Sequence, residues 1–129
     1  MKKFRILVVD DDDNMAFLIQ QRLQNRGCEV RRANDSETGF SIFLNFRPDI
    51  VITDVMIGEE DGLRLMNHIR NFAPNIKTIY ITGALNRHRA ALEEERKRHG
   101  VSVLEKPFVG FDLVRLVYAL EHGREERAT

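Results

Sequence analysis

Five short apolar runs alternate with segments of helical periodicity along the chain, and this alternation constrains the fold more than any other feature. The runs are rich in Val and Ile and span residues 4–9, 28–33, 49–53, 78–82 and 101–104. The first, third and fourth are almost continuously apolar, which is typical of parallel strands covered on both faces. Helical patterns follow them over residues 14–26, 34–46, 62–71, 84–99 and 111–122. The alternation predicts an α/β protein with one doubly wound, parallel, five-stranded sheet and five helices.

The length of 129 residues predicts a single domain. Twenty basic and twenty acidic residues cancel, so no overall field favours nucleic acid or an anionic membrane. Cys28 is the only cysteine, which excludes a disulfide within the chain and favours a reducing, cytoplasmic setting. No stretch approaches the roughly 20 apolar residues of a membrane span. We expect the domain to cover residues 1–122 and residues 123–129 to form a charged tail or the start of a linker.

Polar residues stand at the carboxyl ends of the predicted strands, where doubly wound sheets bind their ligands. The first strand leads into Asp10 and Asp11, and the third is followed by Asp54. The fourth ends at Thr82, and Lys106 follows the fifth. Three carboxylates, one hydroxyl and one ammonium group are therefore expected to converge at one edge of the sheet.

Three converging carboxylates raise one another's pKa values unless a positive charge offsets them. Mg²⁺ prefers oxygen ligands and keeps several waters, so it suits such a group. A carboxylate beside Mg²⁺ can act as a nucleophile toward a phosphoryl group, and Lys106 and Thr82 could then hold the phosphoryl oxygens. The neighbouring Asp12 and Asp13 are expected to cap the first helix rather than to bind metal.

Four segments, in the right order and each at a strand end, resemble the receiver domain of bacterial two-component response regulators. They read "ILVVDDDDNM", "DIVITDVMIGEEDG", "IYITG" and "VLEKPF", and the resemblance covers about residues 4–122. It implies the flavodoxin-like receiver fold, with Asp54 as the phospho-acceptor. It also implies a Mg²⁺ site in which Asp11 binds the ion directly, Asp10 binds mainly through water, and the backbone carbonyl of Met56 is a further ligand beside Asp54.

The same resemblance implies how the domain works. A sensor histidine kinase or a histidine phosphotransfer protein would supply the phosphoryl group from a phosphohistidine. Thr82 would move to hydrogen-bond that group, Lys106 would pair with it, and the Lys106–Pro107 peptide would be cis. The surface of helix 84–99, strand 101–104 and helix 111–122 would change, and any homodimer would use it. Such a domain is not an enzyme beyond its own phosphotransfer and dephosphorylation, and it contacts neither nucleic acid nor membrane directly.

Three positions depart from the family pattern. Gly58 stands where a proline is usual, and Gly83 stands where alanine is commoner. Val103 replaces the aromatic residue whose rotation normally reports phosphorylation, and a β-branched side chain has little rotameric freedom. We therefore expect the signal to travel through residues 83–100, whose helix is polar and has few apolar residues to hold it beyond Ala90, Ala91 and Leu92.

Several alternatives remain open at this point. A pseudo-receiver would have the same fold but bind proteins without phosphorylation, and Val103 keeps this hypothesis open. A Mg²⁺-dependent phosphohydrolase would need a second Asp two residues after Asp54, where Met56 stands. A flavin-binding protein would need a phosphate-binding loop where the acidic residues 10–13 lie. The four histidines and the "EEERKR" run (93–98) are interpreted as solvated surface, and Phe43 and Phe46 as core.

Overall fold

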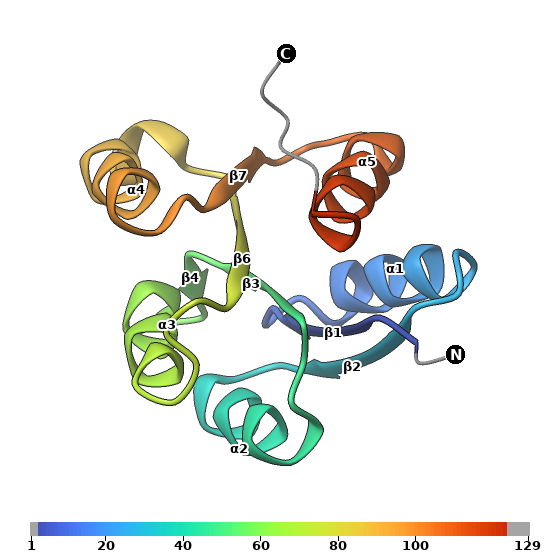
Figure 1. Ribbon diagram of the computed structural model, residues 1–129. Coiled ribbons are helices and arrows are strands. Elements are labelled where there is room, and N and C mark those ends of the chain that lie inside the picture. Colours follow the sequence, from blue (N-terminus) through green and yellow to red (C-terminus); the bar gives the residue numbers. More distant parts are fainter. Residues whose placement is uncertain (1–2, 124–129) are drawn as a thin grey trace.

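One parallel sheet with helices on both faces makes up residues 3–123, the part of the chain that the computed structural model describes (Figure 1). The strands of this sheet are β1 (Arg5–Val9), β2 (Glu29–Ala33), β3 (Ile50–Asp54), β6 (Lys77–Thr82) and β7 (Ser102–Glu105). The helices are α1 (Asp13–Gln24), α2 (Ser36–Phe46), α3 (Gly62–Arg70), α4 (Leu85–His99) and α5 (Gly110–Glu121). The strand order is β2-β1-β3-β6-β7. The predicted doubly wound fold is confirmed, and the predicted tail lies outside the described residues from position 124 onward.

Alternate residues of the central strands enter two separate apolar cores, one on each face of the sheet. On one face, side chains such as Ile6 and Ile52 pack against α1 and α5. On the other face, Leu7 and Val51 pack against α2, α3 and α4 (Figure 1). Strands β1 and β3 are therefore buried on both faces of the sheet, which explains why their sequences are apolar without alternation.

A short antiparallel hairpin lies between β3 and α3 and was not expected from the sequence. Its strands are β4 (Met56–Ile57) and β5 (Glu60–Asp61). Gly58, the first residue of the turn, has a φ of 64°, a backbone conformation that favours glycine. Proline is restricted to a φ of about −65°, so the usual proline would not fit this turn. Strands of two residues carry no detectable period, which is why the sequence pattern did not indicate them.

The aspartate run after β1 begins a helix, as expected. The Asp12 side chain is the N-cap of α1 and accepts hydrogen bonds from the backbone N–H groups of Asn14 and Met15, both at 3.1 Å. Asp13 lies in the first helical turn, where a negative charge is favourable for the helix dipole. The expected capping role is confirmed for Asp12, and Asp13 contributes its charge to the first turn, which leaves Asp10 and Asp11 for the site.

Helix α4 contacts the rest of the protein through few side chains. Its only buried residues are Leu92 and Glu95, while Leu85 packs against the second core from a partly buried position. The expectation that Ala90 and Ala91 hold this helix is wrong, because both are exposed. The interpretation of residues 93–98 as a solvated run is also wrong for Glu95, which is 9% exposed.

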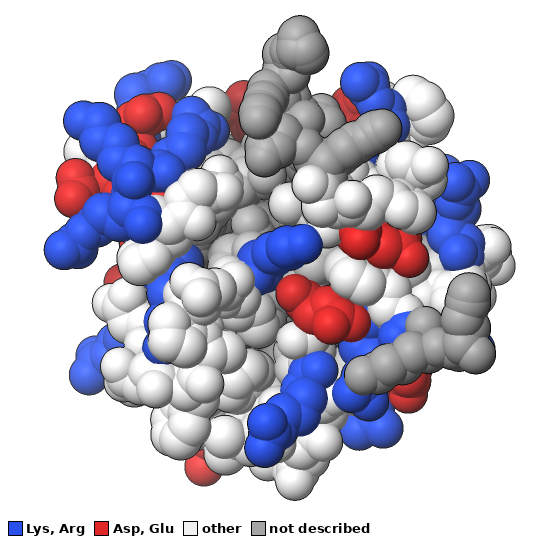
Figure 2. Space-filling view, in the orientation of Figure 1, with Lys and Arg blue, Asp and Glu red and all other residues white. Residues whose placement is uncertain are grey.

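The outer face of α4 is strongly charged. Figure 2 shows basic side chains gathered over this helix at the upper left, with acidic ones between them. Two ion pairs lie on the helix surface, Arg96–Glu93 at 3.0 Å and Arg98–Glu94 at 3.6 Å. Both pairs are solvent-exposed, so each stabilises the helix by at most about 1 kcal/mol. In the described range, residues 3–123, no helix has both the length and the apolar character needed to cross a membrane.

Candidate functional site

The carboxyl ends of β1 and β3 lie side by side in the middle of the sheet. From β1 the chain crosses to β2 on one side, and it later returns to β3 on the other side. Such a reversal of strand order opens a crevice beyond the strand ends. The register pairs Val9 with Thr53, so the next residues along the two strands, Asp10 and Asp54, meet at this crevice.

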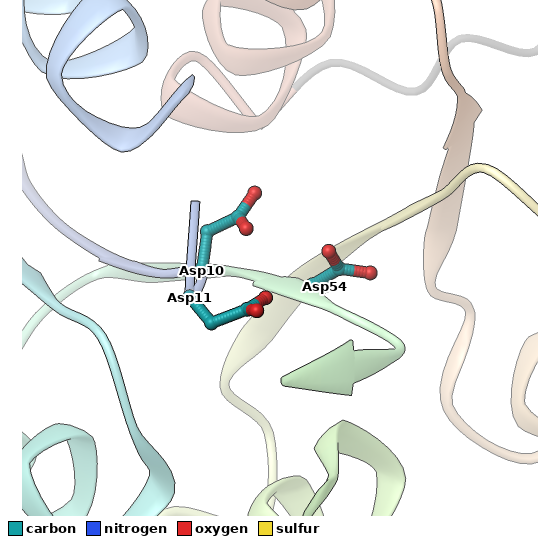
Figure 3. A group of neighbouring side chains, drawn as sticks. All are labelled: Asp10, Asp11 and Asp54. Carbon is teal, nitrogen blue, oxygen red and sulfur yellow. The ribbon is translucent and has the colours of Figure 1, made fainter. Parts of the chain in front are cut away.

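Asp10, Asp11 and Asp54 form one acidic group (Figure 3). One carboxylate oxygen from each lies within 4.8 Å of the other two. Asp10 is 1% exposed and Asp54 is 9% exposed, whereas Asp11 is open to solvent. Figure 3 shows the three side chains reaching from adjacent strand ends into the same space. The convergence of these three carboxylates was correctly anticipated from the sequence.

Lys106 closes the group from the other side. Its Nζ lies 2.9 Å from Oδ2 of Asp54 and 3.4 Å from Oδ2 of Asp10. Its backbone N–H donates to the carbonyl of Thr82 at 2.8 Å, which continues the β6–β7 pairing up to the site. The Lys106–Pro107 peptide bond is cis, as expected.

The electrostatics of the group are unbalanced. Burial raises the pKa of Asp10, and the hydrogen bond from the Asp12 N–H and the charge of Lys106 offset this only in part. Burial by itself lowers the pKa of Lys106, but the hydrogen bond to Asp54 and the charges of Asp10 and Asp54 outweigh that effect and raise it. The group holds three carboxylates, and its one ammonium group contacts two of them, so an additional cation would be stabilised here.

The donor set fits a hard divalent cation such as Mg²⁺. All three side-chain donors are carboxylate oxygens, and the exposed Asp11 leaves one side open to the waters that Mg²⁺ usually retains. The backbone N–H of Met56 donates to Oδ1 of Asp54 at 3.3 Å, which keeps the Met56 backbone next to the group. A metal-binding role for the Met56 carbonyl remains a prediction.

Thr82 lies at the end of β6, on the side of the site toward α4. Its side chain is 2% exposed, and its Oγ1 accepts a hydrogen bond from the backbone N–H of Ala84 at 3.0 Å. Within residues 3–123, no hydrogen bond joins the Thr82 hydroxyl to Asp54. The hydroxyl proton is therefore available to a further acceptor, while the loop leading into α4 is tied to the same oxygen.

Gly62 belongs to the site, although the sequence analysis did not single it out. A Cβ at this position would lie 2.1 Å from the backbone carbonyl oxygen of Asp54. The N–H of Gly62 also donates to the carbonyl of Val55 at 2.7 Å. The hairpin therefore returns directly onto the backbone of Asp54. A glycine as the first residue of a helix, where better helix formers exist, is the sequence signal that could have identified it.

Replacing Asp10 by Asn is expected to stabilise the metal-free protein at neutral pH. The pKa of Asp10 is raised in the folded state. Its contribution to stability is therefore complete below the ordinary value of 3.8 and is lost as the pH rises through the folded-state pKa. An amide is neutral and can still accept the Asp12 N–H, which lies 3.0 Å from Oδ1.

Denaturant unfolding in the presence of a chelator, from acidic to neutral pH, measures this effect. The wild-type protein should lose stability relative to the Asp10→Asn variant as the pH rises. Added Mg²⁺ should reverse the order, because the variant lacks one carboxylate. A variant that is less stable than wild type at neutral pH without metal would contradict the prediction.

Known proteins resemble this chain over most of its length. The model of the response regulator receiver domain matches residues 6–118. The transcriptional regulator NtrC of Azospirillum brasilense is 32% identical over 123 residues, which are 95% of this chain and 24% of NtrC. The transcriptional regulatory protein RprY of Bacteroides fragilis is 35% identical over 81 residues, which are 63% of this chain and 34% of RprY. The chain thus spans at most about a third of these two relatives.

Solved structures show the same fold. The response regulator TrrA of Thermotoga maritima, determined in complex with Mg²⁺ and beryllofluoride, superposes with a TM-score of 0.77. It is 30% identical in sequence, and the match covers 91% of this chain and 98% of that one.

Proposed function

Because the chain belongs to the response regulator receiver family, we propose that phosphorylation of Asp54 switches it between two signalling states. Receiver domains of this family act in phosphorylation-dependent two-component signalling. The single observation that carries the proposal is the position of Asp54. Its carboxylate belongs to the acidic group and is also the closest partner of Lys106, so a nucleophile and its positive counter-charge are already in contact.

The residues have distinct roles in the proposed reaction. A carboxylate oxygen of Asp54 attacks the phosphorus of a phosphohistidine, the P–N bond breaks, and its electron pair returns to the donor imidazole. Lys106 moves from the Asp54 carboxylate to the transferred phosphoryl oxygens. Thr82, with its hydroxyl proton available, donates to another phosphoryl oxygen. When bound by Asp10, Asp11 and Asp54, Mg²⁺ would neutralise the negative charge that this reaction brings together.

We expect Mg²⁺ to bind weakly, at about millimolar strength, because waters would fill several coordination positions. Backbone NMR shifts of residues 10–11 and 54–57 should respond to a Mg²⁺ titration. In Asp11→Asn the same titration should need a much higher concentration. If these residues do not respond, or if the variant responds like wild type, the metal site is wrongly assigned.

The direct test of the function is formation of a phosphoryl adduct. Intact-protein mass spectrometry after incubation with acetyl phosphate should detect one adduct with Mg²⁺ and none with a chelator. Absence of the adduct from wild type in the presence of Mg²⁺ would contradict the proposed function.

The partners follow from the family. Receiver domains of response regulators interact with histidine kinases, and we propose a sensor histidine kinase or a histidine phosphotransfer protein as the phosphoryl donor here, in the cytoplasm. NtrC and RprY carry names of transcriptional regulators. An output domain of that kind would make the contacts to DNA, and residues 1–122 would make none. Any homodimer is proposed to form through α4, β7 and α5.

The route of the signal is proposed to run through α4. Val103 lies on β7 at the usual aromatic position and is half-buried against the second core, so its rotation cannot carry the signal. Addition of beryllofluoride and Mg²⁺ should change amide hydrogen exchange in residues 83–100 more than in β7. Changes confined to residues 54–62 would exclude this route and would favour a pseudo-receiver that binds its partner without phosphorylation.

A further inference from the structure

A buried polar triad of Arg70, Tyr80 and Glu95 connects three elements of the second face. Tyr80 on β6 is 0% exposed, and its hydroxyl donates to Oε1 of Glu95 on α4 at 2.7 Å. Arg70, the last residue of α3, donates from Nη2 to the same oxygen at 2.9 Å. The side chains of Arg70 and Glu95 are 8% and 12% exposed. One carboxylate oxygen thus receives two donors in a site that is largely shielded from water.

The triad supplies a large share of what positions α4. Apart from Glu95, the only buried side chain of this helix is Leu92. The N-cap residue of the helix, Ala84, makes no side-chain capping hydrogen bond, so its backbone carbonyl, which accepts from the N–H groups of Arg87 and His88, is all that it offers the first turn. A hydrogen bond to a charged acceptor stabilises more than a neutral one does. The Tyr80 hydroxyl and Arg70 therefore fix α4 where few apolar contacts exist to do so.

The triad also shares a strand with the site. Tyr80 and Thr82 are two residues apart on β6, so their side chains project from the same face of the sheet. Thr82 accepts from Ala84 N–H, and Ala84 leads directly into α4. When Thr82 turns toward a phosphoryl group, the loop at Ala84 must adjust. The triad holds the part of α4 around Glu95 and resists its movement.

We propose that the Tyr80–Glu95 contact, supported by Arg70, holds α4 in its resting position and thereby opposes activation. This inference rests on the proposed function. Its physical basis is that a contact formed in one state shifts the balance between two states by its differential free energy. Nε and Nη1 of Arg70 are buried without a partner among the described residues. The triad is therefore incompletely hydrogen-bonded. Fewer hydrogen bonds are lost when it rearranges than would be expected for a buried group of this size.

The substitution Tyr80→Phe tests the proposal, because it removes one hydroxyl and keeps the buried ring. The matched control is Tyr118→Phe, the same chemical change on the exposed face of α5. Without any ligand, amide exchange across residues 85–99 should be faster in Tyr80→Phe than in wild type. With Mg²⁺ present, the affinity for beryllofluoride should rise, by up to about tenfold, since loss of one hydrogen bond to a charged group has about that effect on an equilibrium. Affinity for Mg²⁺ alone should stay unchanged.

A second pair of variants distinguishes loss of the triad from a general loss of stability. Glu95→Gln removes the charge from the triad with little change in shape, and Glu94→Gln makes the same change on the exposed face of α4. Glu95→Gln should act in the same direction as Tyr80→Phe, and Glu94→Gln should behave like wild type.

Three outcomes have separate meanings. If Tyr80→Phe matches wild type in both α4 exchange and beryllofluoride affinity, or binds beryllofluoride less tightly, the proposal is overturned. If wild type itself fails to bind beryllofluoride with Mg²⁺, the proposed function fails, while the exchange measurement still tests whether the triad holds α4. Faster α4 exchange together with tighter beryllofluoride binding supports both.

Discussion

Asp54→Asn is expected to abolish phosphoryl uptake, with a rate reduced more than about a thousandfold, since removal of a covalent nucleophile costs an enzyme at least that much. The amide has nearly the shape of the carboxylate but is a far weaker nucleophile. It also removes the charge that faces Lys106 at 2.9 Å. The fold should persist, because Lys106 still has Asp10 at 3.4 Å. Mass spectrometry after acetyl phosphate treatment with Mg²⁺ measures the loss.

Two further variants help to interpret the result for Asp54→Asn. Asp13→Asn is the matched control, because Asp13 is an exposed aspartate in the first turn of α1 and lies outside the acidic group. It should be phosphorylated like wild type. Lys106→Ala should retain Mg²⁺ binding but show an impaired response to beryllofluoride. Retention of a full adduct in Asp54→Asn would mean that another residue is the acceptor.

Gly62→Ala is expected to destabilise the fold by about 2–4 kcal/mol, from the upper half of the range for ordinary overpacking in a core to somewhat beyond it. The added Cβ would lie 2.1 Å from the carbonyl oxygen of Asp54; that oxygen belongs to the backbone, and a Cβ has no rotatable bond that could move it aside. Relief therefore requires movement of β3 or of the start of α3, and either movement displaces the acceptor carboxylate. Denaturant unfolding should show the loss of stability, and the rate of adduct formation should fall with it.

Gly110→Ala is the matched control, because its new Cβ would meet a flexible side chain and not the backbone. A Cβ at Gly110 would lie 2.5 Å from the guanidinium carbon of Arg22, which is the end of a long side chain that can move aside. This variant should therefore lose little stability. If both variants are destabilised equally, the close approach of Gly62 to Asp54 does not explain the effect.

The sheet and the acidic group could be predicted because each depends on a local pattern. Apolar runs without alternation mark strands buried on both faces, as in β1 and β3. The residue that follows each strand is then placed by topology alone, which is how Asp10, Asp11 and Asp54 were expected to meet. Asp12 was assigned correctly because an N-cap depends only on its near neighbours.

The remaining features depend on contacts between distant parts of the chain. Glu95 lies in a run of charged residues, and its burial follows from Tyr80 and Arg70, which are 15 and 25 residues away in sequence. Its spacing of three from Leu92 was a signal that it shares the inward face of α4, but charge suggested solvent instead. The contact of Gly62 with the Asp54 carbonyl is equally invisible without the hairpin that produces it.

The two cores on opposite faces of the sheet have a consequence for how the sequence can change over time. Their strand members come from alternate residues of the same strands, and no side chain within residues 3–123 belongs to both. Substitutions in the two cores that lie more than about 7–10 Å apart and share no partner should add within about 0.3–0.5 kcal/mol. The helix side of the core under α1 and α5 can therefore accumulate substitutions with little effect on the core under α2, α3 and α4. During evolution, the core that supports α4 could therefore change while the packing of α1 and α5 on the other face of the sheet stays the same.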